Sequence, residues 1–156
     1  MKSLLSVALV SLFSVGFSAQ ADGFVCENLD STLSVKVYNH VKADEGTRNV
    51  AVMVLTDPQL QVGNRTIAVL RAPKTLRSDR LTFSGRVDLR FSESSRKGEL
   101  ILGTKLGELK TVALTTDFSY ALPLMHGEEL DATLKLTKRN GDVIKEEMIC
   151  NRYLKN

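Results

Sequence analysis

The chain has 156 residues, of which 43% are hydrophobic and 25% are charged, and its formal net charge is +3. A length and composition of this kind predict one compact domain with a substantial core. The charge excess is too small for a nucleic-acid-binding protein, and the polar side of 81–91 has no aromatic residue on which bases could stack. We therefore expect no nucleic acid among the partners.

The first 21 residues have the pattern of a secretory signal. Lys2 gives a short positive region, Leu4 to Val15 form an apolar segment too short to span a membrane, and Ala19-Gln20-Ala21 is a small-x-small cleavage site. This pattern predicts an exported protein, periplasmic or extracellular, whose single domain covers residues 22–156 and has no transmembrane segment.

The first half of the predicted domain is a series of short strands. Residues 33–39 alternate between apolar and polar side chains, which is typical of a strand with one buried face. Residues 49–56 are apolar at both alternating positions, so we expect a central strand that is covered on both faces. Residues 66–71 form a further short strand, which we expect Pro73 to close because proline lacks a backbone donor.

The second half continues the alternation. Residues 81–91 form the longest run, with Gly85 at a place where a bulge or bend would fit. Residues 99–104 and 109–115 predict a hairpin around Leu106-Gly107. Residues 118–122 predict one more strand.

The chain closes on a hairpin between 130–136 and 144–150, joined at Asn140-Gly141. A three-residue loop with Gly141 in the left-handed region pairs Lys138 with Asp142, and the apolar residues of both strands then share one face. A two-residue loop would mix the faces, so we predict the first register. Glu146, opposite Leu134, is the one charged residue on this otherwise apolar face.

The cysteines lie near the two ends of the predicted domain. Cys26 and Cys150 are the only two in the chain, and in an exported protein they predict one disulfide. We predict an all-β fold, either a single antiparallel β-barrel or a β-sandwich of about eight or nine short strands, with the termini tied by this bond.

Positive charge is concentrated in one third of the chain. Between Arg65 and Lys97 there are nine basic and three acidic residues, and seven of the nine are arginine, whose planar group suits carboxylate and phosphate. Arginines that share an exposed strand face would form a site for an anionic envelope polymer or an acidic protein surface; the alternative is a solvated face with ion pairs. The candidate ligand-binding residues are Arg77, Arg80, Arg86, Arg90, Arg96 and Lys97.

No motif for catalysis or metal binding is present. His40 and His126 are isolated, without the spacing that a metal site needs, and no nucleophile or phosphate-binding motif occurs. Neighbouring carboxylates such as Glu146-Glu147 point to opposite faces of a strand. We therefore expect no metal, no cofactor and no enzymatic activity.

The sequence predicts an exported binding or interaction module. Its first candidate surface is the basic strand face, and its second is the loop from Ser92 to Gly98. The alternative is a lipocalin-like carrier of a small apolar ligand inside the barrel, and a third is an enzyme of unknown chemistry. The chain contains no tryptophan, so it lacks the Gly-x-Trp strand with which lipocalins begin.

Overall fold

The computed structural model describes six stretches of the chain, and these carry the fold. They are residues 22–39, 50–59, 66–77, 80–87, 94–117 and 127–153. The signal segment, the strand expected at 118–122 and both histidines lie outside the described residues.

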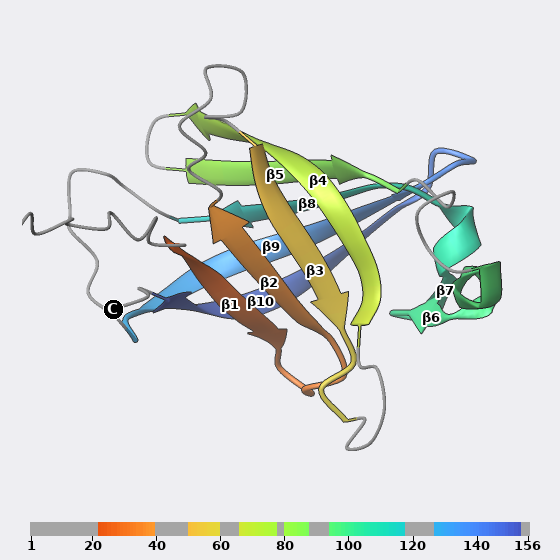
Figure 1. Cartoon of the computed structure of the whole chain (residues 1–156), viewed down its shortest axis with the longest axis horizontal. Helices are drawn as coiled ribbons and strands as arrows, with labels where there is room; N and C mark the ends of the chain where they lie inside the picture. The colour runs from red at the N-terminus through yellow and green to blue at the C-terminus, as the bar shows by residue number, and fades with distance from the viewer. Residues whose placement is uncertain are drawn as a thin grey trace, which may run out of the picture.

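Eight antiparallel strands form a closed barrel in which each strand pairs with its neighbours on both sides (Figure 1). Strands that follow one another along the chain are neighbours in the barrel, in the order β1-β2-β3-β4-β5-β8-β9-β10, and β10 closes on β1. The eight strands are β1 (Asp22–Asn28), β2 (Ser34–Asn39), β3 (Val50–Thr56), β4 (Thr66–Arg77), β5 (Arg80–Arg86), β8 (Leu109–Thr116), β9 (Glu129–Lys138) and β10 (Val143–Tyr153). The all-β prediction is confirmed, and the choice left open by the sequence is settled as a barrel.

The β9–β10 hairpin has the register that the apolar pattern predicts. Ile144 lies opposite Leu136 and Glu146 opposite Leu134. Gly141 has φ +99°, in the left-handed region that a three-residue loop requires. The N–H of Lys138 donates to the carbonyl of Asp142 at 2.8 Å and closes the loop.

The disulfide joins the two strands that close the barrel. Cys26 on β1 lies directly opposite Cys150 on β10, with the Cα atoms 3.9 Å apart although the two residues are 124 positions apart in sequence. Both side chains are fully buried. The predicted bond is therefore confirmed, and it fixes the first and last strands of the sheet to each other.

The apolar sides of the barrel strands face the interior. Phe24 and Phe83 meet from opposite parts of the barrel with ring centroids 6.1 Å apart, and the Arg152 guanidinium carbon lies 5.2 Å from the Phe24 centroid. Other large side chains with less than 2% exposure include Met53, Leu55, Leu81, Leu114, Leu134 and Leu136. Burial of this apolar surface is the main driving force for closing the sheet.

β4 does not end at Pro73, so the expected strand end is wrong. The strand continues to Arg77, and Pro73 lies where β4 changes its pairing partner from β3 to β5. Pro73 is the last residue of β4 paired with β3, and Lys74 is the first paired with β5. A residue at this junction can do without a ladder N–H, which is the donor that proline lacks.

β3 has one buried face instead of the two that its sequence predicts. Met53 and Leu55 point into the barrel, while Val52 and Val54 face outward and are half-buried. Tyr38 on β2 is the cross-strand neighbour of Val52, and Val69 on β4 is that of Val54. The outward valines therefore pack beside other exposed apolar side chains of the sheet.

The hairpin expected around Leu106-Gly107 is also wrong. β6 (Leu100–Ile101) pairs with β7 (Thr104–Lys105) in a separate two-stranded ribbon, whose turn has positive φ at Leu102 and Gly103. Two short 3₁₀ helices flank the ribbon, η1 (Ser94–Gly98) and η2 (Leu106–Glu108). The loop expected after residue 91 is helical over η1, and β8 returns to the barrel beside β5.

The described part of the chain contains no helix long and apolar enough to cross a membrane.

Candidate binding surfaces on the barrel wall

Four cationic side chains gather on the outer wall where β5, β8, β9 and β10 lie side by side. Arg86 on β5 is paired with Thr111 of β8, and the preceding Lys110 accepts the Val87 N–H at its carbonyl. Lys135 on β9 lies opposite Ala113 of β8. We call the four side chains the basic patch: Arg86, Lys110, Lys135 and Lys145.

Lys110 joins this patch because of an irregularity in β8. The register between β8 and β9 shifts between Leu109 and Thr111, so both Lys110 and Thr111 face outward in succession. With neighbouring strands about 4.8 Å apart, the patch extends about 15 Å across the four strands. It is an open surface of positive charge.

Two members of the patch are directly opposed. Lys135 on β9 and Lys145 on β10 are cross-strand partners, and both side chains are exposed. Like charges in this position repel each other and destabilise the sheet. Among the described residues, no carboxylate forms an ion pair with any member of the basic patch.

The arginines singled out by the sequence are distributed over different places. Arg80 starts β5 and pairs with Asp117 at 3.4 Å, with both side chains mostly exposed. Arg86 is on the same outward side, but six residues along a strand separate the two by about 20 Å. Only Arg86 of the pair reaches the basic patch.

Two of the remaining candidates, Arg96 and Lys97, lie in η1 and not on the four strands that carry the basic patch. Arg96 in η1 pairs with Glu99 at 3.3 Å, and Lys97 beside it is exposed. The backbone of Arg77 is the cross-strand partner of Arg80, but its side chain is outside the described part, as is the whole of Arg90. Their part in binding stays a prediction.

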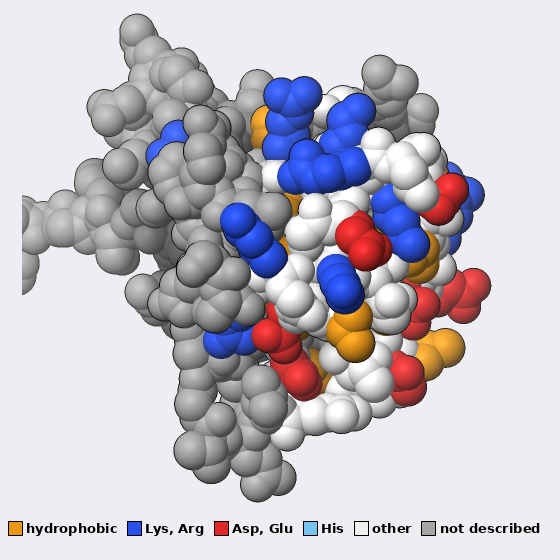
Figure 2. Space-filling view, turned by 90° about the vertical axis from the view of Figure 1, so that its right-hand side faces the viewer, with side chains coloured by type: hydrophobic (Ala, Val, Ile, Leu, Met, Phe, Trp, Pro, Cys, Tyr) orange, Lys and Arg blue, Asp and Glu red, His pale blue; other side chains and the backbone are white. Residues whose placement is uncertain are grey.

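The η1–η2 segment and the β9–β10 hairpin lie at the same end of the barrel (Figure 1). Arg139 at the hairpin tip connects them, because its Nε donates to the Gly107 carbonyl at 3.2 Å and its N–H to that of Glu108 at 2.8 Å. Figure 2 shows this end from outside, with most Lys and Arg side chains in the upper part of the face and most Asp and Glu lower down and to the right. The two signs of charge are therefore largely separated.

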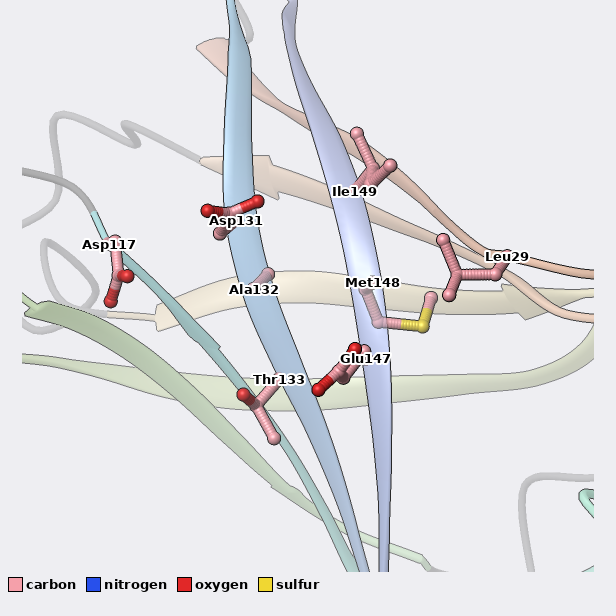
Figure 3. A pocket seen from close by; sticks show the side chains of 8 residues that line it. All are labelled: Leu29, Asp117, Asp131, Ala132, Thr133, Glu147, Met148 and Ile149. Atoms are coloured by element: carbon pink, nitrogen blue, oxygen red, sulfur yellow. The ribbon is translucent and has the colours of Figure 1, made fainter.

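Next to the basic patch, toward the other end of the wall, is an acidic depression of about 360 Å³. Figure 3 shows that its lining comes from β9, β10, the end of β8 and the turn after β1. The residues that line it are Leu29, Asp117, Asp131, Ala132, Thr133, Glu147, Met148 and Ile149. Asp117 and Asp131 are neighbours across β8 and β9, joined by a 3.0 Å backbone hydrogen bond.

A buried asparagine organises the β1–β2 turn. Asn28 donates from Nδ2 to Glu146 at 3.2 Å and to the Thr32 hydroxyl at 2.9 Å, and its Oδ1 accepts the Leu33 N–H at 2.8 Å. Glu146, the misfit of the sequence pattern, is therefore half-buried and held by a structural partner. The Thr32 hydroxyl donates to Asp30 at 2.7 Å and lowers the pKa of that exposed carboxyl from its ordinary value of 3.8.

The described residues contain no group of three or more histidine, cysteine or acidic side chains that could hold a metal ion. Asp117, Asp131 and Glu147 thus share a depression without forming a coordination site.

These features define a disulfide-closed, eight-stranded antiparallel barrel with charge-separated surface patches. No family model, curated protein or solved structure matches the chain.

Proposed function

We propose that this protein is an exported, non-enzymatic binding module that recognises an anionic polymer or an acidic protein surface through the basic patch. The observation that carries the proposal is the opposed pair of Lys135 and Lys145, extended across the wall by Arg86 and Lys110. A disulfide that ties the barrel closed suits an oxidising compartment outside the cytosol.

The physical argument begins with the cost of this arrangement to the free protein. An anionic group placed between Lys135 and Lys145 is attracted by both ammonium groups at once, and these two attractions offset the repulsion between the lysines, which is present with or without the ligand. Arg86 adds a planar donor group that suits carboxylate or phosphate. A ligand with several charges can engage all four side chains at once, whereas a single small anion cannot.

The test is binding of two fluorescently labelled probes, inorganic polyphosphate and poly-glutamate, measured by anisotropy at low and high salt. The test variant carries Arg86→Glu and Lys110→Glu. The matched control carries Arg80→Glu and Arg96→Glu, which changes the net charge equally but alters side chains that already have ion-pair partners.

We expect the test variant to bind at least about tenfold more weakly than the native protein, and the control to lose much less. Binding by the native protein should also weaken as salt rises, because the patch is exposed and its charges are screened. Equal loss in both variants would show attraction to net charge alone. Equal retention in both, or no binding of either probe, would overturn the proposal.

A further inference from the structure

The outward side of β10 has a charge pattern that complements itself when reversed. Four alternating residues form it, and we call them the β10 strip: Val143, Lys145, Glu147 and Ile149. Both ends are exposed hydrophobic side chains, Val143 at 46% and Ile149 at 39%. Read from either end, the strip is apolar, charged, oppositely charged and apolar, over about 20 Å.

This pattern matters when two copies of the strip face each other in opposite directions. Lys145 of each copy then meets Glu147 of the other, and Val143 meets Ile149. A two-fold axis in the interface plane, perpendicular to β10 and passing between Lys145 and Glu147, produces this arrangement. A parallel arrangement would place Lys145 on Lys145 and Glu147 on Glu147, so the charges select the antiparallel one.

Residues of β9, which pairs with β10, also make complementary contacts about this two-fold axis. Thr133 is the cross-strand partner of Glu147, and Lys135 is that of Lys145. In the antiparallel arrangement the Lys135–Lys145 pair of one copy faces Thr133 and Glu147 of the other. These two residues line the acidic depression, and Asp131 lies next to them (Figure 3). The acidic depression of each copy therefore lies opposite the lysine pair of the other copy. The two-fold symmetry produces this contact twice.

We propose that the protein associates reversibly with a second copy of itself through the β10 strip. The barrel wall curves away on both sides, so the contact is limited to β10 and its closest neighbours. A contact of this size belongs with small, transient interfaces and not with obligate dimers. The proposal is independent of the ligand proposed above, although Lys145 belongs to both surfaces.

The experiment is sedimentation velocity over protein concentrations of about 10 µM to 1 mM, a range suited to weak association. It compares the native protein with Lys145→Glu, Glu147→Lys, an equimolar mixture of these two variants, and the double variant carrying both changes. Lys105→Glu and Glu108→Lys are matched controls, because both residues are exposed and lie away from the strip.

The native protein should shift toward dimer with concentration, and less so in high salt. Each single variant should self-associate at least about tenfold more weakly, because like charges then face each other. The mixture and the double variant should recover association, since both restore opposite charges at every position. The two controls should behave like the native protein.

A native protein that stays monomeric throughout would overturn the proposal, and so would single variants that dimerise as the native does. A mixture that stays monomeric would also overturn it. The Arg86→Glu and Lys110→Glu variant separates this proposal from the proposed function, since it should lose polyanion binding and keep dimerisation. Glu147→Lys should do the reverse.

Discussion

Lys135 on β9 and Lys145 on β10 occupy opposed positions of one hairpin, with both ammonium groups on the exposed side of the barrel. The pair lies two residues along each strand from Thr133 and Glu147, which line the acidic depression. The like-charged pair itself is unfavourable for the free sheet and favourable for an anionic partner.

The first prediction concerns the cost of that pair. Lys135→Glu should raise the free energy of unfolding by about 0.2–1 kcal/mol, because an opposite-charge pair replaces a like-charge pair. Urea denaturation at low salt would measure the gain, and high salt should reduce it. Lys105→Glu, whose cross-strand neighbour is the uncharged Leu100, should show no such gain. An unchanged or lower stability for Lys135→Glu would contradict the account.

The second prediction concerns barrel closure. Replacing both Cys26 and Cys150 by alanine should lower the free energy of unfolding by about 4–5 kcal/mol, the chain-entropy value for a loop of this length. Chemical denaturation of the native protein with and without reductant would give the same loss. Reductant should not change the stability of the double-alanine variant, which serves as the control. A loss below about 1 kcal/mol would show that strand pairing alone holds the ends together.

The third prediction concerns the packed interior. Phe83→Ala should cost about 3–5 kcal/mol, because Phe83 is fully buried against Phe24 and its removal leaves a cavity in the barrel. Leu100→Ala on the exposed ribbon should cost less than about 0.5 kcal/mol. Thermal and urea unfolding would compare the two. Similar, small losses in both would indicate a barrel interior with room for a ligand.

The fourth prediction concerns pH. The Thr32 hydroxyl lowers the pKa of Asp30 in the folded state, so the contribution of Asp30 to stability is present above its ordinary value of 3.8. That contribution is lost as the pH falls through the folded-state pKa. Asp30→Asn should therefore be less stable than the native protein at neutral pH and equal to it in strong acid. Urea denaturation across this range would check the trend, and a difference that grows toward acid would contradict it.

The sequence predicted local pairing well, because a turn and an apolar alternation together determine one register. The predicted pairing of Lys138 with Asp142 already places Lys135 opposite Lys145, so the proximity of two of the four patch residues follows from the predicted register. The approach of Arg86 to this pair depends on β5 lying beside β8, with a ribbon and two short helices between them in the chain. Periodicity contains no information about such non-local neighbours.

Two predictions were wrong because each strand was considered without its neighbours in the sheet. Pro73 was expected to end its strand, but β4 changes partner there and needs no donor at that position. Val52 and Val54 suggested a strand with two buried faces, and they are instead half-buried among outward apolar neighbours. Both outcomes depend on which strands lie on either side, and only the closed barrel supplies that information.

The central claim is that an anionic ligand binds at the basic patch, and amide NMR during titration tests it most directly. Oxidised protein labelled with ¹⁵N would be titrated with inorganic polyphosphate and, separately, with poly-glutamate. The account predicts chemical-shift changes centred on Arg86, Lys110, Lys135 and Lys145, which decrease as salt is added. Changes confined to inward-facing residues such as Phe24 and Met53, or no changes at all, would contradict it.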